Sequence, residues 1–434
     1  MSRLAARFLL TLTMLGLLAG CVSAPRPGAD ADLLAAARAD PARALALMRE
    51  QGERLAHKPF IPGNNAQLLV NGPAAFAALS RAIDGARRRI DMESYEYDRQ
   101  AGARFSDLLL AARARGVEVN LIYDAWGALG TPASMFDRLK QAGVRVLEFN
   151  PLTPNDRVGI HLNRRDHRKL LCVDGGIAIT GGVNISQVYE NRPQLAGTPV
   201  AQAAWRDTDV AITGPVVGQF EHYFMETWHA QHGAPLPPPP QSSTTPQSMP
   251  RGDMLVQAID GAPVSHHPLI YRTLLSVIGL SRHSVHLTTG FFAPTPELAR
   301  ALAAAARRGV DVQIVVPSQS TSDEALEAGR SHYETLLKAG VKIHERLHRV
   351  LHAKTAVVDG AWSAIGSSNL DWRSVVWNNE IDAVIIDRGF GARMETLFAF
   401  DVSQSRTIDL RHWRERPLLE RFLEWQAGLV QSLL

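Results

Sequence analysis

Cysteine, lysine and long apolar segments are all scarce in this chain of 434 residues. Its two cysteines, Cys21 and Cys172, are too few for a disulfide-stabilised scaffold or a cysteine-based zinc site. A formal net charge of only +3 gives no reason to expect a nucleic-acid partner, because such proteins carry large basic surfaces. Apolar residues make up 46% and charged residues 21%, a globular composition, and the length predicts two or three domains.

One apolar run lies near the N-terminus, between Phe8 and Ala19, and follows two arginines. It is shorter than the roughly 20 residues that a membrane-spanning helix needs, but it fits a secretory signal. The run ends in Leu18-Ala19-Gly20-Cys21, which resembles a bacterial lipobox; an ordinary signal peptide with an incidental cysteine is the alternative. We therefore predict lipidation of Cys21 and a membrane-anchored lipoprotein on the periplasmic side of the inner or the outer membrane.

The rest of the chain contains one unit twice. LLLAARARGVEVNLIYD at 108–124 matches ALAAAARRGVDVQIVVP at 301–317, and each is an Ala/Arg-rich helix, a glycine stop and a β-branched strand. The repeated order predicts an α/β fold with a partly parallel sheet in two homologous domains. We divide the chain into a signal peptide (1–20), an N-terminal spacer and helix (21–57), a first domain (58–234), a Pro-rich linker (235–251) and a second domain (252–434).

Two matched motifs carry the chemistry. In both, a lysine follows a histidine by two residues, an aspartate by seven and an asparagine by 17. The two sets are His167, Lys169, Asp174 and Asn184, and His352, Lys354, Asp359 and Asn369. Alternation through LLCVD and TAVVD predicts strands, so that His and Lys share a face and the residue between them points away. We expect Gly181, Gly182 and Gly366 to let the backbone approach a ligand closely.

The lysines of these motifs are themselves informative. Only six of the 46 basic residues are lysine, so a lysine at both matched positions has a chance of about 0.02 if any positive charge would serve. A compact ammonium group suits a phosphate oxygen better than a planar guanidinium group does. The pattern therefore favours a phosphate site.

The paired HxKxxxxD motifs, each followed by GxxN or GSxN, resemble the HKD motifs of the phospholipase D superfamily. MESYEY (92–97), WRDTD (205–209) and GSSNLDWRS (366–374) are similar to segments of bacterial cardiolipin synthases. The resemblance covers about residues 60–430. It implies two phospholipase D-like α/β/α sandwich domains related by a pseudo-two-fold axis, with the active site between them.

The resemblance also implies a mechanism without metal or cofactor. One histidine attacks phosphorus to form a phosphatidyl-histidine, and the other protonates the departing alcohol and then activates the acceptor phosphatidylglycerol. We assign His167 as the nucleophile and His352 as the acid and base, although the pseudo-symmetry permits the reverse. Lys169, Lys354, Asn184 and Asn369 would hold the phosphate. The donor is a second phosphatidylglycerol or phosphatidylethanolamine, and the enzyme works at a membrane surface.

Each imidazole also needs a carboxylate that fixes its tautomer. Glu380 lies downstream of His352 in the same half and is the candidate for that histidine; the aligned Asp207 is then the candidate for His167, with Asp209 as its competitor. Asp174 and Asp359 are included among the catalytic residues because the family motif includes them. Turn formation explains each of them at least as well.

Two other functions stay open at this point. The first is a hydrolase of the same superfamily, either a lipid phospholipase D or a nuclease; the second is a non-catalytic lipid-binding lipoprotein. The amphipathic C-terminal segment at 418–434 is expected to pack on the core rather than on a bilayer.

Overall fold

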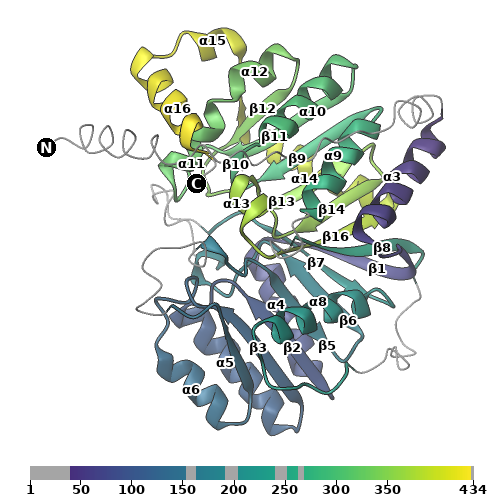
Figure 1. Ribbon diagram of the computed structural model, residues 1–434, viewed down its shortest axis with the longest axis vertical. Helices are drawn as coiled ribbons and strands as arrows, with labels where there is room; N and C mark the ends of the chain where they lie inside the picture. Colours follow the sequence, from purple (N-terminus) through teal and green to yellow (C-terminus); the bar gives the residue numbers. More distant parts are fainter. Residues whose placement is uncertain (1–39, 153–162, 191–203, 240–251, 262–267, 432–434) are drawn as a thin grey trace, which may run out of the picture.

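The computed structural model describes residues 40–152, 163–190, 204–239, 252–261 and 268–431. The chain forms two similar halves, stacked along the long axis of the molecule (Figure 1). The predicted signal peptide with Cys21, and most of the predicted linker, lie outside the described residues. No helix within the described ranges is long and apolar enough to cross a membrane.

The two halves share a common order of core elements, to which the second half adds short strands and helices, and helix α3 (Pro41–Ala56) precedes both. The first half consists of β1 (Ile61–Val70), α4 (Asn71–Gly85), β2 (Arg89–Ser94), α5 (Arg99–Ala114), β3 (Glu118–Asp124), α6 (Ala133–Gln141), β4 (Arg145–Phe149), β5 (Lys169–Val173), β6 (Ile177–Gly181), the 3₁₀ helix η1 (Gln187–Tyr189), β7 (Thr208–Thr213) and α8 (Val217–Ala230). The second half consists of β8 (Met254–Gly261), α9 (Leu269–Leu280), β9 (Ser284–Thr289), β10 (Phe292–Ala293), α10 (Pro296–Arg307), β11 (Asp311–Pro317), α11 (Asp323–Arg330), α12 (Tyr333–Lys338), β12 (Lys342–Arg346), β13 (Lys354–Val358), β14 (Trp362–Gly366), β15 (Leu370–Asp371), α13 (Trp372–Val376), β16 (Glu380–Ile386), α14 (Arg388–Ser403), β17 (Ser405–Thr407), α15 (Leu410–Arg414) and α16 (Leu418–Val430).

A single sheet runs through both halves. Its order is β17-β12-β11-β9-β13-β14-β16-β8-β1-β7-β6-β5-β2-β3-β4, and the antiparallel pair β1 and β8 joins the halves. In each half three neighbouring strands are parallel, β2-β3-β4 and β9-β11-β12, because a helix crosses over between them. The predicted partly parallel α/β fold, with two homologous domains, is confirmed.

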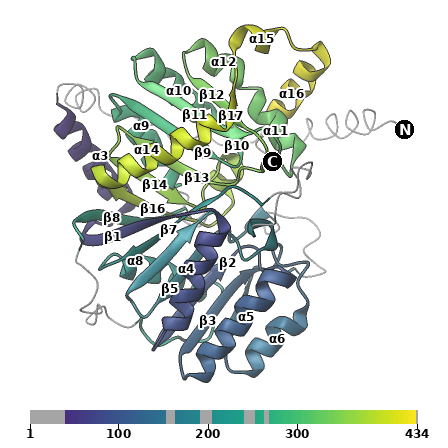
Figure 2. The ribbon, with the colours of Figure 1, turned by 180° about the vertical axis from the view of Figure 1, so that it is seen from behind.

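Helices cover both faces of this sheet, as the view from behind also shows (Figure 2). Helices α8 and α14 share one core with residues of both halves, including Leu170, Cys172 and Val357. Leu171 and Val173 face the opposite core under α4 and α5. The strict alternation along β5 confirms that Cys172 is a core residue on the face away from His167 and Lys169.

The turns of the repeat form as their glycines predict. After α5 and after α10, Gly116 and Gly309 both have φ +89°, a left-handed conformation that glycine adopts without steric cost. Each helix ends there, and β3 or β11 begins two residues later. The matched sequences therefore specify matched local structures.

The helices at the two ends of the chain differ in how far their apolar side chains are buried. Leu47 and Met48 of α3 are buried against the second half, beside α9, although α3 precedes the first half in sequence (Figure 1). Helix α16 packs on α11 through Ala427. The expectation that the C-terminal segment packs on the core therefore holds only for the side of α16 that carries Ala427. Its other apolar side chains are exposed: Leu418 (78%), Leu419, Phe422, Trp425 (57%) and Leu429.

Candidate active site

The two motif histidines meet between the halves. His167 lies two residues before the start of β5, and His352 lies two residues before the start of β13. The centroids of their rings are 6.5 Å apart, with a 73° angle between the ring planes. Both side chains are largely buried. The predicted meeting of the motifs is therefore confirmed, at a separation that lets both rings reach one phosphorus atom.

A carboxylate lies against the Nδ1 atom of each ring, but from the opposite half to that expected. Both carboxylate oxygens of Glu380 lie 3.0 Å from Nδ1 of His167, and Oδ2 of Asp207 lies 2.7 Å from Nδ1 of His352. The two residues were predicted correctly, whereas the assignment of Glu380 to His352 and of Asp207 to His167 was wrong.

The reason for this exchange is the pairing of backbone segments between the halves. The N–H of His167 donates to the carbonyl oxygen of Asn379, directly before Glu380, at 2.9 Å. The N–H of His352 donates to the carbonyl oxygen of Arg206, directly before Asp207, at 2.8 Å. The backbone of each histidine is thus hydrogen-bonded to the residue that precedes the carboxylate residue of the other half. This contact brings that carboxylate to the histidine ring.

These contacts fix the protonation of both rings. An ionised carboxylate can only accept a hydrogen bond, so Nδ1 carries the proton and Nε2 keeps its lone pair. Burial lowers the pKa of His167 to about 4 and the pKa of His352 to about 3, although Glu380 and Asp207 act in the opposite direction. Both imidazoles are therefore neutral in the free enzyme at neutral pH, which a nucleophile or a general base requires.

The carboxylates themselves are held in their charged form. Burial would raise the pKa of Asp207, but His352 and Lys354 outweigh it, and this pKa lies below its ordinary value. The pKa of Glu380 is lowered in the same way by His167 and Lys169. Glu380 also accepts hydrogen bonds from Ser374 Oγ (2.8 Å) and Asn378 Nδ2 (3.3 Å).

The two motif lysines are buried beside the histidines. Each Nζ donates to the carbonyl oxygen of the histidine of its own motif. Burial lowers the pKa of Lys169 to about 7 and the pKa of Lys354 to about 8. Between His167 and Lys169, Arg168 points to the opposite face, where it donates to Thr227 of α8, so the predicted alternation is confirmed.

The glycines of the motifs lie directly against buried carboxylates. A Cβ atom on Gly182 would overlap Oδ1 of Asp207, and one on Gly366 would overlap Oδ1 of Asp382. The predicted close approach of a ligand to the backbone of these glycines stays a prediction. The absent side chains make room for buried acidic groups.

Asp209 and its counterpart Asp382 have a supporting role. Asp209 accepts the backbone N–H of Val183 at 3.0 Å, and Asp382 accepts that of Ser368 at 3.3 Å. Burial raises the pKa of Asp209 well above its ordinary value and that of Asp382 to about 7. Asp209 is therefore no competitor of Asp207, because it supports the loop that leads to Asn184.

Asp174 and Asp359 lie away from these groups, at the far ends of β5 and β13. Each has a positive φ, and the carboxylate of Asp174 accepts three backbone N–H groups at 2.8 Å while that of Asp359 accepts those of residues 282–284. Five strand residues span about 16 Å, too far for contact with the phosphate site. Their inclusion among the catalytic residues is corrected: they close turns.

The motif asparagines lie at the site in different surroundings. Asn184 donates to the hydroxyl of Tyr189 at 3.2 Å and accepts the backbone N–H of Glu96 at 3.2 Å. The backbone N–H of Asn369 is bound by Ser374 at 3.1 Å. Their predicted contact with a phosphate stays a prediction.

Sequence reasoning missed the aromatic and acidic walls of the site. The hydroxyl of Tyr189 lies 3.0 Å from Nδ1 of His352, and the rings of Trp205 and Phe291 lie 5.3 and 6.5 Å from the His352 ring. Tyr95 contacts the ring of His167 at 5.1 Å. Glu96 interacts with both motif lysines, and burial raises its pKa.

Among these residues, Tyr189 could have been found from the motif spacing. Tyr189 follows Asn184 by the same number of residues as Ser374 follows Asn369.

Among the described residues, no group of three or more His, Cys, Asp or Glu side chains could hold a metal ion. Two α/β halves that each bring a histidine and a lysine to one shared site define a phospholipase D-like enzyme. The family model described as "Cardiolipin synthase, PLD-like domain" matches residues 79–193 and 274–402. The chain therefore belongs to the cardiolipin synthase family of phospholipase D-like proteins.

Individual relatives agree with this assignment. The chain is 32% identical over 367 residues to cardiolipin synthase A of Cronobacter sakazakii, a match that covers 84% of this chain and 74% of that protein. It is 29% identical over 388 residues to a cardiolipin synthase of Alkalihalophilus pseudofirmus, with 88% and 75% covered. The crystal structure of phosphatidylserine synthase from Haemophilus influenzae has the same fold, with a TM-score of 0.65 at 13% identity, and covers 89% of this chain and 100% of its own.

Proposed function

We propose that the protein is a phosphatidyltransferase that makes cardiolipin by transferring a phosphatidyl group to phosphatidylglycerol. The observation that carries this proposal is the pair of imidazoles, 6.5 Å apart, each with its Nδ1 bound to a carboxylate of the other half. Two such groups can serve as nucleophile and proton carrier on opposite sides of one phosphorus. The relatives named cardiolipin synthase supply the substrate class.

The first half-reaction forms a covalent intermediate. Nε2 of His167 attacks the phosphorus of the donor lipid, and the bond between phosphorus and the headgroup oxygen breaks. His352, protonated on Nε2 when the anionic phosphate is bound, gives that proton to the leaving oxygen, so that glycerol or ethanolamine departs. Lys169 and Lys354 neutralise the equatorial phosphate oxygens.

The second half-reaction reverses these roles. His352, now neutral, takes the proton from a headgroup hydroxyl of the acceptor phosphatidylglycerol. The hydroxyl oxygen attacks phosphorus, the bond to Nε2 of His167 breaks, and both histidines return to their starting states. Water in place of this hydroxyl would give phosphatidic acid, which is the outcome of the hydrolase alternative.

We also propose that the protein is a membrane-anchored lipoprotein, held on the periplasmic side through Cys21. Exposed apolar side chains near the site support contact with a membrane surface. In the first half, Trp126 and Leu129 are 50% and 62% exposed, on the segment whose Gly127 packs against the backbone of Tyr95. In the second half, α16 packs against Ala293, two residues after Phe291. Both apolar groups therefore flank residues that contact the two histidines.

The test uses the purified full-length protein with vesicles of phosphatidylglycerol. We expect cardiolipin and free glycerol in equal amounts, and loss of both products in His167→Asn. A strain that lacks its own cardiolipin synthases should regain cardiolipin when it carries this gene. Phosphatidic acid as the main product, or cardiolipin formation in His167→Asn at the wild-type rate, would contradict the proposal.

A further inference from the structure

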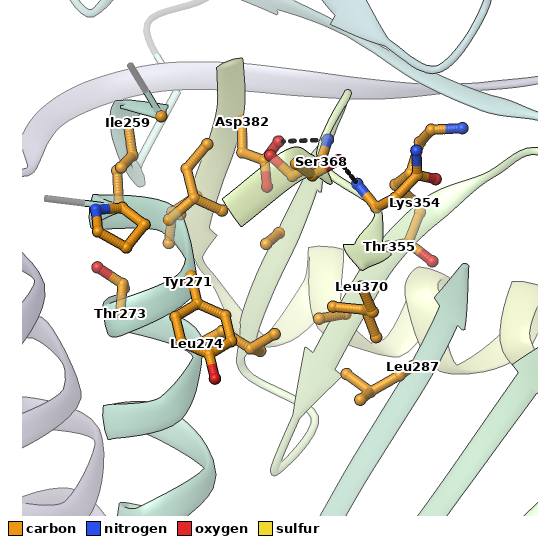
Figure 3. A pocket seen from close by; sticks show the side chains of 18 of the residues that line it. Ile259, Tyr271, Thr273, Leu274, Leu287, Lys354, Thr355, Ser368, Leu370 and Asp382 are labelled. Atoms are coloured by element: carbon orange, nitrogen blue, oxygen red, sulfur yellow. Dashed lines mark hydrogen bonds between the residues drawn. The ribbon is translucent and has the colours of Figure 1, made fainter. Parts of the chain in front are cut away.

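The two halves differ beneath their motif lysines. In the second half an apolar cavity lies between α9 and the sheet, with about 750 Å³ of empty space, its open mouth included. Its walls include Tyr271, Leu274, Leu287 and Leu370, whereas Lys354 stands at one end (Figure 3).

Smaller side chains at matched positions open this space. Positions of the motif strands in the two halves correspond with the same offset along the chain as that between His167 and His352. By this offset Ala356 and Ala364, a facing pair on β13 and β14, take the places of Leu171 and Ile179, a facing pair on β5 and β6.

A third smaller side chain lies at the end of the cavity nearest the catalytic groups. Ser374 lines the cavity, whereas the matched Tyr189 of the first half is fully buried in the core with Leu171 and Ile179. The first half therefore has a filled core beneath Lys169. The second half has a hollow beneath Lys354, where one leucine, one isoleucine and one tyrosine of the first half are replaced by smaller residues.

The hollow is continuous with the phosphate site. Lys354 and Asn369, both predicted to hold the phosphate, belong to its lining together with Ser374, which donates to Glu380. Ala356 follows Lys354 on the same face of β13, so the apolar wall begins directly below the ammonium group. A molecule that fits this shape has an anionic head and an apolar tail.

We infer that one acyl chain of a phospholipid substrate inserts into this cavity, so that the second half binds the lipid by its tail as well as by its phosphate. The inference rests on the proposed function for its substrate class and adds an unequal role for the two halves. Burial of chain methylenes against Leu274, Leu287 and Leu370 would supply the binding free energy.

The test introduces the larger side chains of the first half at the matched positions of the second half. Ala356→Leu with Ala364→Ile should fill the cavity without touching a catalytic group, and Ala304→Leu on the exposed side of α10 is the matched control. We expect kcat/KM for long-chain phosphatidylglycerol to fall about tenfold or more, since several methylenes lose their site. Turnover of the dibutyryl lipid should change less than about twofold, because its short chains can bury only a few methylenes in this space.

A second measurement needs no variant. Phosphatidylglycerol with a photoreactive diazirine at the end of one long chain should label the wild-type protein within residues 269–280 or 354–364, and the double variant should lose this label. Labelling elsewhere only, or an equal loss of long-chain and short-chain turnover at an unchanged melting temperature, would overturn the inference. Failure of the wild type to transfer from either lipid would refute the proposed function instead, while the label would still report the chain site.

Discussion

Asp207→Asn tests the pairing of each histidine with the other half. In the wild type, Nδ1 of His352 donates to the ionised carboxylate of Asp207 at 2.7 Å. An asparagine at this position keeps the shape but loses the charge, and its NH₂ group can donate to Nδ1. The His352 ring would then carry its proton on Nε2, the atom that must accept a proton in the second half-reaction.

The expected magnitude follows from the type of contact. A hydrogen bond to a charged group contributes about 1.5–3 kcal/mol, and about 1.4 kcal/mol corresponds to a tenfold change. We therefore expect kcat to fall about 10- to 150-fold. Asp209→Asn is the matched control, because burial favours the neutral form of Asp209 and this substitution removes little charge. It should cost much less activity.

The assay combines kinetics with ¹⁵N NMR spectra of the histidine side chains. We expect the ¹⁵N shifts of His352 to report a change of tautomer in Asp207→Asn, while those of His167 keep their wild-type values. Glu380→Gln should produce the converse result. A shift of the His167 signals in Asp207→Asn, with His352 unchanged, would refute the cross-half pairing.

Three further outcomes are expected. Lys169 and Lys354 lose their charge with pKa values of about 7 and 8, so kcat/KM should fall about tenfold per pH unit between pH 7 and 8 and about 100-fold per unit above pH 8. Lys169→Arg should remove the step near pH 7 and leave a fall of about tenfold per unit above pH 8, and a flat profile from pH 7 to 10 would contradict this. Gly182→Ala should lower activity about as much as Asp207→Asn and destabilise the fold by about 1–3 kcal/mol, because its Cβ would overlap the Asp207 carboxylate; wild-type melting and turnover would refute this. In a Cys21→Ser background, Trp425→Gln should weaken sedimentation with phosphatidylglycerol vesicles but leave turnover of dispersed dibutyryl lipid unchanged, whereas equal sedimentation would exclude α16 as a membrane contact.

Much of the site could be predicted because its signals are local. The alternation in LLCVD and TAVVD places His and Lys on one face of a strand, and the same spacing recurs in the second half. Glu380 and Asp207 were also predicted as the orienting carboxylates, since both stand where a strand begins. For Asp174 the sequence left catalysis and turn formation open, because a motif shows only which residues recur, and contact with three backbone N–H groups decides for the turn.

The sequence by itself determined the repeat, the partly parallel α/β fold and the histidines and lysines of the site, because strand periodicity and turn glycines act over a few residues. Only the tertiary structure decided that each imidazole is bound by the carboxylate of the other half. That pairing depends on backbone hydrogen bonds such as His167 to Asn379, between segments that lie in different halves of the chain, which no local pattern encodes. The hollow beneath Lys354 was likewise decided in three dimensions, because Ala356, Ala364 and Ser374 leave a space only where strands and helix α9 bring their side chains together.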